Sequence, residues 1–423
     1  MLMLLGVMAA PDWLAIAGSA MRNPYYTGPL SAIFMLWGEC VARGMSPRTA
    51  TIFRGLGLLA VVLLSGWFYG SLPAQATELW ISRLYLAIAL GLMVAVPGAA
   101  VFLLASGLIP ARQLGGVTLR WAAVFAPFLI FILSASFGLA LVSKLRPVVA
   151  DPVMLRMDES LGFHAAVFFG SLNYAGTVLW DAQYIVYTGL GAFVMAVAGG
   201  LFLQKARFAL RRCLLAFLLV GFFGWVGYWQ FPVVGPYHAW PELFARVSPE
   251  VRAASLQAAL TRTTPLTEAP EVLRDSVPSL HAAWALIALI AAWKQSRGFF
   301  LVALPVGGLS IVTTLTLSMH YTADLIAAVP FALFCWWLAD RLARCSVEGD
   351  EAAALVVPME RRRYATAIFL GLEMLCLALW YLWSWEAPVA VWVVWTGIIV
   401  VGGGTVVAAA RVGAETRLAV KEQ

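Results

Sequence analysis

Charged side chains are scarce in this chain of 423 residues. Only 12% of its residues are Asp, Glu, Lys or Arg, whereas 62% are hydrophobic. A soluble domain carries roughly 25% charged residues. A chain with half that share cannot cover a water-exposed surface, so the composition excludes an ordinary soluble protein and predicts that most of the surface faces lipid.

Cysteine is also rare, and its five copies stand far apart without a paired spacing. A zinc site or a disulfide framework needs cysteines at short, regular spacings. No cluster of carboxylates suggests another metal site either. The formal net charge of +6 is spread over short loops and forms no single basic patch. We therefore expect no cofactor, no metal and no nucleic-acid partner.

Long apolar runs, in contrast, recur along the whole chain. A helix that crosses a bilayer needs about 20 mostly apolar residues. Two segments near 2–18 and 28–43 are weaker candidates, because Pro11 and Glu39 interrupt them. With these, we expect an all-α polytopic membrane protein of about ten to twelve helices. The stronger candidates lie near 54–72, 84–107, 118–142, 180–203, 210–229, 278–294, 298–318, 321–340, 364–383 and 388–410.

Basic residues mark every second loop between these segments, for example Arg112, Lys205, Lys294 and Arg361. Loops rich in Lys and Arg stay on the cytoplasmic side of a membrane. The opposite, non-cytoplasmic face then holds the segment 143–178, the long loop 231–276 and the turn near 319–321.

Histidine occurs only four times, as His164, His238, His281 and His320. All four fall on the predicted non-cytoplasmic face or at its membrane boundary. The stretch Ser276-Val277-Pro278-Ser279-Leu280-His281 opens a predicted helix, since Pro278 suits a first helical turn. Free backbone N–H groups there can hold a phosphate, and Ser279 adds a hydroxyl group. His281 would give a proton to the leaving oxygen.

The second informative stretch is His320-Tyr321-Thr322-Ala323-Asp324. Residues four apart share a helix face, so Asp324 is predicted to bind one imidazole nitrogen of His320. The other nitrogen is then free to attack, and His281 supplies a neighbouring acid. Either motif alone is easily a chance match at a helix boundary. Together, on one predicted face, they favour His320, Asp324 and His281 as catalytic residues.

These two blocks resemble the second and third signature motifs of the type 2 phosphatidic acid phosphatase superfamily, P-S-G-H and S-R-x-x-x-x-x-H-x-x-x-D. Leu280 stands where the family has glycine, and Thr313 and Thr314 stand where it has Ser-Arg. Both departures resemble the inositol phosphorylceramide synthase branch. The resemblance covers roughly 118–341 and implies a six-helix catalytic core, a phosphohistidine intermediate and no metal. We therefore expect N-terminal membrane helices in 1–117, and C-terminal helices with a cytoplasmic tail in 342–423.

The phosphate-binding residues are less well defined by this resemblance. The family's first motif, K-x-x-x-x-x-x-R-P, appears here as Arg146-Pro147, with Leu139 at the lysine position and Lys144 too close. Arginine suits phosphate best because of its forked donors. Arg146 and Arg274 are the first candidates, followed by Lys144 and Ser279. For each arginine, contact with lipid head groups is the alternative.

The sequence thus predicts a membrane enzyme that cleaves a lipid phosphate ester on the non-cytoplasmic face. Its substrate is a lipid phosphate or phospholipid. The acceptor is the hydroxyl group of a lipid or sugar, which makes a phosphotransferase, or water, which makes a lipid- or polyprenyl-phosphate phosphatase. An alternative of another class is a lipid transporter in which the histidines relay protons.

Overall fold

The computed structural model of the protein is almost entirely helical, which confirms the predicted all-α class. One short antiparallel pair, β1 (Val148–Val149) with β2 (Leu266–Thr267), is the exception among the described residues. The structure describes residues 34–35, 37–39, 41–43, 45–71, 80–107, 110–112, 114–116, 118–119, 139, 142–172, 177–245, 247–262, 264, 266–268, 273–345, 360–386, 393–394 and 396.

Four of the described helices are long and apolar enough to cross a membrane: α4 (Pro47–Ser71), α11 (Arg207–Gln230), α16 (Arg297–Thr316) and α17 (Thr322–Cys345). They match predicted segments, as do α5 (Trp80–Ala105) and α19 (Glu360–Glu386). The predicted segments near 2–18, 118–142 and 388–410 lie largely outside the described residues, and 28–43 is described only in part. These helices are those of a multi-pass integral membrane protein.

One predicted helix, near 180–203, is divided in the structure. It consists of α9 (Val178–Thr188) and α10 (Leu190–Leu203), which are bent by 46° at Gly189. Gly189 is both the C-cap of α9 and the N-cap of α10, and its N–H still bonds the Ile185 carbonyl. The apolar run is therefore continuous while the helix axis is not, and the pair counts as a fifth candidate span.

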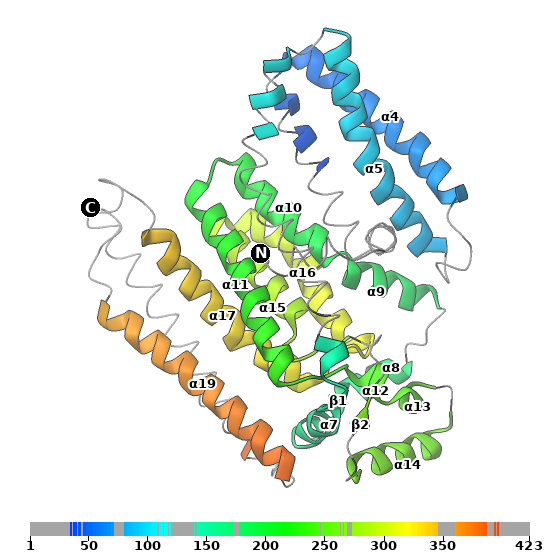
Figure 1. Ribbon diagram of the computed structural model, residues 1–423, viewed down its shortest axis with the longest axis vertical. Coiled ribbons are helices and arrows are strands. Elements are labelled where there is room, and N and C mark those ends of the chain that lie inside the picture. Colours follow the sequence, from blue (N-terminus) through cyan, green and yellow to red (C-terminus); the bar gives the residue numbers. More distant parts are fainter. Residues whose placement is uncertain are drawn as a thin grey trace. The chain divides into compact units, whose positions relative to one another are not determined.

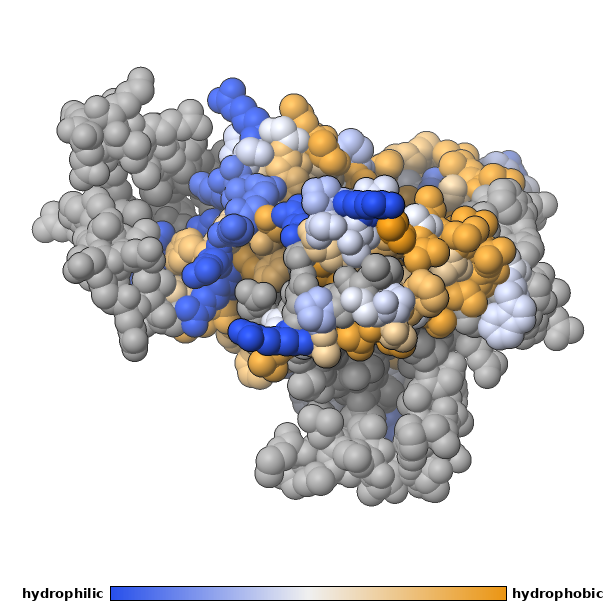
Figure 2. All heavy atoms as spheres, turned by 90° about the horizontal axis from the view of Figure 1, so that it is seen from above, coloured by the Kyte–Doolittle hydropathy of each residue, from blue (hydrophilic) through white to orange (hydrophobic). Residues whose placement is uncertain are grey.

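Outward-facing apolar side chains fit a lipid environment. On α4, the exposed fractions of Leu58 and Leu63 are 67% and 64%, and on α16 that of Val302 is 75%. Hydrophobic residues also cover much of the face drawn in Figure 2. In water such a surface would drive aggregation, whereas in a bilayer it needs no partner.

The chain forms two compact units. The first comprises Met1–Gly138, Ala175–Leu210 and Ala288–Thr313. In it α4 and α5 lie side by side (Figure 1). Their contact is close because Gly91 of α5 faces the backbone of α4 at Ser65, where a Cβ atom would meet the Ser65 nitrogen at 3.2 Å.

The second unit comprises Leu139–Tyr174, Arg211–Ile287 and Thr314–Gln423 and contains every candidate site residue. Its shorter helices are α7 (Asp151–Glu159), α8 (Ala165–Leu172), α12 (Pro236–Ala239), α13 (Pro241–Phe244) and α14 (Pro249–Leu260), followed by the start of α15 (Leu280–Gln295). A buried apolar cluster joins α7 with α12, α13 and the start of α17.

The helix α19 also belongs to the second unit and packs against α7 and α17. Two hydrogen bonds tie it to the end of α7. Arg156 Nε donates to the Ser384 carbonyl at 2.7 Å, and Trp380 Nε1 donates to Ser160 Oγ at 2.8 Å. Arg156 thus binds one of the last carbonyl groups of α19, a favourable place for a cation.

Candidate active site

The position of His320 is set by the way α16 ends. Ser318 adopts a left-handed conformation, with φ of 57°. The N–H groups of Met319 and His320 both bond the Thr314 carbonyl, at 3.0 and 3.2 Å. This is a Schellman-type helix end, with serine in the place that glycine usually takes. The Ser318 hydroxyl donates to the Ala166 carbonyl at 3.0 Å, which anchors the turn.

The predicted contact between His320 and Asp324 is present, but it does not come from a shared helix face. His320 lies before α17, which begins at Thr322. Asp324 stands in the first turn of α17 and reaches back. Its Oδ2 atom accepts the Tyr321 N–H at 3.0 Å and lies 3.3 Å from His320 Nδ1. The carboxylate therefore caps the helix and orients the imidazole at once.

A second acceptor fixes which nitrogen of His320 carries the proton. The Ser276 carbonyl oxygen lies 3.1 Å from Nδ1. A carbonyl can only accept, so the hydrogen of the neutral ring is on Nδ1 and the lone pair is on Nε2. His320 is 2% exposed, and this burial lowers its pKa to about 4, although the charge of Asp275 and the Ser276 carbonyl oppose the shift. The ring is therefore neutral at pH 7.

The second histidine lies close to the first. His281 is in the first turn of α15, which begins at Leu280, while residues 276–279 form a turn ahead of it. The ring centroids of His281 and His320 are 6.0 Å apart, with an interplanar angle of 53°. An attacking nitrogen starts about 3–3.5 Å from phosphorus, and an acid bonds the leaving oxygen at about 2.6–3.2 Å. A phosphoryl group bound by both rings would have to meet both of these conditions.

Ser279, predicted as a phosphate ligand, is fully buried and caps α15. Its Oγ atom accepts the Ala282 N–H at 3.3 Å, and its own N–H bonds the Asp324 carbonyl at 3.4 Å. The cap uses the hydroxyl oxygen and leaves its hydrogen available. Ser279 thus joins the start of α15 directly to the start of α17.

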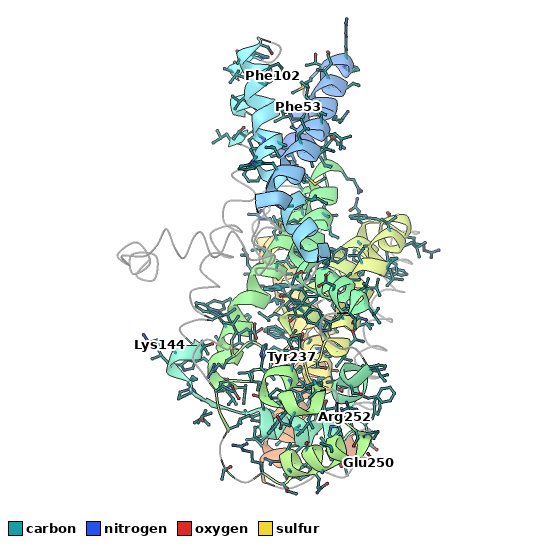
Figure 3. The ribbon with its side chains drawn as sticks, turned by 90° about the vertical axis from the view of Figure 1, so that its right-hand side faces the viewer. Phe53, Phe102, Lys144, Tyr237, Glu250 and Arg252 are labelled. Carbon is teal, nitrogen blue, oxygen red and sulfur yellow. The ribbon has the colours of Figure 1, made fainter. Side chains whose placement is uncertain are left out.

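The predicted basic residues differ in their surroundings. Arg274 is fully buried, and its guanidinium donates to the Arg146 carbonyl at 3.2 Å and to the Glu268 carbonyl at 2.7 Å. These carbonyls flank the β1–β2 pair, so Arg274 stabilises that pair. Arg146 itself is partly buried. Lys144 is exposed, and it lies at the periphery in the view of Figure 3.

Two buried aspartates of α7 were not predicted as site residues. Asp151 accepts the N–H groups of Val234 and Gly235 at 3.0 and 2.9 Å, and the Tyr321 hydroxyl at 3.0 Å. The Tyr321 hydroxyl in turn accepts the Trp240 indole N–H at 2.9 Å. A buried polar chain therefore connects α7 to the residue that follows His320.

Asp158 binds the start of α17 in the same way. Its two carboxylate oxygens accept the N–H groups of Thr322 and Ala323 at 3.0 and 2.9 Å. Burial raises the pKa of both Asp151 and Asp158 to about 7, and the backbone N–H donors oppose that rise. Their spacing of seven residues places both on one face of α7. That spacing is a sequence signal that could have found them.

Glycine at position 235 lets a third segment approach the His320 loop. Its φ is 91°, and a Cβ atom there would collide with the Met319 carbonyl oxygen. The neighbouring Tyr237 N–H bonds the Ser318 carbonyl at 2.9 Å. Segments 233–237, 274–279 and 318–324 are thus held together by direct hydrogen bonds.

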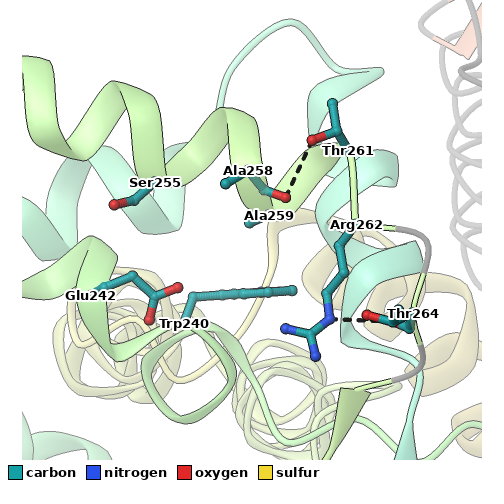
Figure 4. A pocket seen from close by; sticks show the side chains of 8 residues that line it. All are labelled: Trp240, Glu242, Ser255, Ala258, Ala259, Thr261, Arg262 and Thr264. Carbon is teal, nitrogen blue, oxygen red and sulfur yellow. Dashed lines mark hydrogen bonds between the residues drawn. The ribbon is translucent and has the colours of Figure 1, made fainter.

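A cavity of about 530 Å³ lies next to this network, with Trp240 in its wall. In the view of Figure 4, Glu242 and Arg262 lie toward opposite ends of the Trp240 ring. Arg262 Nε donates to the Thr264 carbonyl at 3.2 Å. The other lining residues are Ser255, Ala258, Ala259 and Thr261. Within the described part of the chain, no three His, Cys, Asp or Glu side chains come together as a metal site.

A model of the PAP2 superfamily matches residues 153–338. No curated protein and no solved structure gives a significant match. The PAP2 match includes His281, His320, Asp324 and Asp158, and it ends before α19. It supports a phosphatase-type enzyme that acts on lipid phosphates in general, in a family of phosphatases and phosphotransferases.

Proposed function

We propose that this protein cleaves a lipid phosphate ester through a phosphohistidine on His320 and transfers the phospho-head group to a hydroxyl acceptor. The observation that carries the proposal is the double anchor on Nδ1 of His320. The Ser276 carbonyl and Asp324 hold that nitrogen at 3.1 and 3.3 Å. The lone pair is therefore on Nε2. The ring centroid of the second histidine, His281, lies 6.0 Å from that of His320.

In the first step, Nε2 of His320 attacks phosphorus and forms the N–P bond. The bond between phosphorus and the lipid oxygen breaks, and protonated His281 gives its proton to that oxygen. The lipid leaves as an alcohol. The phosphorylated imidazole carries a positive charge, which Asp324 stabilises across the Nδ1 hydrogen bond.

In the second step, the acceptor hydroxyl attacks phosphorus while neutral His281 takes its proton. The N–P bond breaks, so His320 returns to its neutral form and His281 is protonated again. Nothing in this cycle needs a metal ion. The negative charge on the phosphoryl oxygens is met by backbone N–H groups at the start of α15, where the positive end of the helix dipole also lies.

Cationic side chains complete the phosphate site in this proposal. Arg146 is the first choice, with Arg274, Lys144 and the Ser279 hydroxyl as further ligands. Among these, Arg274 already donates to two backbone carbonyls. A substitution of Arg274 therefore affects folding, whereas Arg146→Lys tests phosphate binding more directly, because lysine keeps the charge and loses the fork.

A lipid hydroxyl as acceptor is favoured by the departures at Leu280 and Thr314, which resemble the inositol phosphorylceramide synthases. We therefore favour a transferase, with inositol phosphorylceramide synthase-like chemistry. Water in place of the lipid hydroxyl would make the same site a lipid- or polyprenyl-phosphate phosphatase. The lipid transporter alternative gives no product of either kind.

The test uses purified protein in lipid nanodiscs. It is given a panel of lipid phosphates, and separately phosphatidylinositol with a hydroxylated lipid, and products are followed by phosphate release and mass spectrometry. A new phosphodiester lipid that appears only with the acceptor supports the transferase. Free phosphate without an acceptor identifies a phosphatase. If neither product forms, or if His320→Asn is as active as the parent, the proposal is wrong.

A matched control is available at His164, which pairs with Glu159. We expect His164→Asn to retain activity and His320→Asn to fold but not to turn over. The proposed site faces the non-cytoplasmic side. A cysteine introduced in 231–276 should therefore react with an impermeant thiol reagent added to intact cells, and labelling only after permeabilisation would reverse this orientation.

A further inference from the structure

One short helix, α7, holds the loop that carries His320. α7 contributes two carboxylates, Asp151 and Asp158, whose exposed fractions are 0% and 1%. Asp158 binds the first two N–H groups of α17, and Asp151 binds the Tyr321 hydroxyl. Residues 321, 322 and 323 are thus each fixed by α7, and they are the residues that connect His320 to Asp324.

We propose that Asp151 and Asp158 are positioning residues, which set the geometry between His320 and Asp324 without touching the substrate. The proposal rests on the function proposed above for His320.

The hydrogen bonds explain why carboxylates are needed at both places. Each oxygen of Asp158 accepts one N–H, so an amide would turn its NH₂ group toward a donor. The same holds for Asp151, which accepts two N–H groups and one hydroxyl. A carboxylate at the start of α17 also interacts favourably with the positive end of the helix dipole.

Hydrogen bonds hold both ends of the helix that carries the two aspartates. The end of α7 is tied to α19 through Arg156 and Ser160, at 2.7 and 2.8 Å. Its start is tied to the chain at Pro232, whose carbonyl accepts the Ala150 N–H at 2.8 Å. A helix fixed at both ends transmits little motion to the loop that it holds.

The experiment compares Asp151→Asn and Asp158→Asn with the parent enzyme in single-turnover formation of phosphohistidine, using whichever lipid phosphate the panel above shows to be a substrate. We expect the rate at saturating substrate to fall about 10- to 100-fold, with KM unchanged, because each change leaves a buried N–H without an acceptor. Asp181→Asn is the matched control, since Asp181 is also a buried first-turn carboxylate, on α9 in the other unit. It should lower thermal stability only.

A second readout separates positioning from general destabilisation. If the loop loosens, water reaches His320, and the acid limb of kcat/KM moves up from about 4 toward the ordinary value of 6.5. The control Asp181→Asn leaves that limb in place. Unchanged rates and an unchanged acid limb in both aspartate variants would overturn the proposal.

A third variant keeps the test valid if the aspartate variants do not fold. Thr322→Pro removes one N–H donor to Asp158 while leaving both carboxylates in place, and proline is favoured at a first helical position. We expect it to slow phosphohistidine formation, and to add little to Asp158→Asn in the double variant, because both remove the same bond. Full additivity would contradict the proposal. If the parent enzyme forms no phosphohistidine, the proposed function fails instead.

Discussion

The substitution Asp324→Asn separates charge from orientation in the proposed nucleophile. In the structure one oxygen of Asp324 accepts both the Tyr321 N–H and the His320 Nδ1–H, while the other, Oδ1, has no partner among the described residues. An asparagine can place its carbonyl oxygen at the first position and its NH₂ group at the second. The reverse orientation would set donor against donor. We therefore expect the geometry to survive and only the charge to be lost.

The size of the effect follows from the second anchor on the ring. Hydrogen bonds to charged groups contribute roughly 1.5–3 kcal/mol and those between neutral groups roughly 0.5–1.5 kcal/mol. The midpoints differ by about 1.2 kcal/mol, so we expect attack to be slower by roughly eight- to tenfold. In a serine protease triad, where the carboxylate alone fixes the tautomer, the same change costs about 10⁴-fold. Here the Ser276 carbonyl still holds Nδ1–H.

The assay is the single-turnover rate of phosphohistidine formation for the parent, Asp324→Asn and Asp324→Ala, with folding checked by thermal unfolding in detergent. Asp324→Ala also removes the helix cap and should be slower and less stable than Asp324→Asn. A loss near 10⁴-fold in a well-folded Asp324→Asn would refute the reasoning. It would mean that the Ser276 carbonyl does not fix the tautomer and that Asp324 alone does.

Three further predictions concern the same region. Because burial lowers the pKa of His320 to about 4, Nε2 stays unprotonated down to that pH. With a phosphodiester substrate that does not itself titrate there, the limb of kcat/KM that reports protonation of His320 should lie near pH 4; such a limb near 6.5 would show a solvated ring. Tyr321→Phe leaves the buried Trp240 N–H without its acceptor and should lower the free energy of unfolding by roughly 1–3 kcal/mol in denaturant titration; no change would mean that water replaces the hydroxyl. Gly235→Ala should destabilise by at least about 1 kcal/mol because its φ is 91°, whereas Gly57→Ala, in open space on α4, should be neutral or stabilising; equal effects would show that the left-handed turn is not required.

The membrane helices are the part of the fold that the sequence predicts best. A run of about 20 apolar residues can be recognised without knowing which residues meet in the folded protein. The bend at Gly189 was missed for the same reason, since hydropathy does not report backbone angles. The contact of His320 with Asp324 was predicted because residues four apart share a helix face. In the structure, Asp324 lies in the first turn of α17 and its carboxylate reaches back to the residues before the helix. This arrangement has the same spacing of four residues.

The surroundings of the site were harder to predict because their partners are distant in sequence. Asp151 and Val234 are 83 residues apart, and Asp158 and Thr322 are 164 residues apart. The role of Arg274 was also hard to predict, because the carbonyl that it binds, that of Arg146, is 128 residues away in the sequence. A charge in a loop of a lipid enzyme resembles a phosphate ligand until its backbone partners are known. Roles as phosphate ligands stay predictions for Arg146 and Arg274.

The hydrogen bonds between α7 and α19 extend beyond the segment that the PAP2 family model matches. The PAP2 match ends at residue 338, yet Trp380 and Ser384 bind the helix that carries Asp151 and Asp158. A gene shortened after α17 would keep every catalytic candidate and still lose the support behind them. Inactivity of such a fragment would then say nothing about the chemistry of the two histidines, and expression trials of a minimal catalytic core should retain α19.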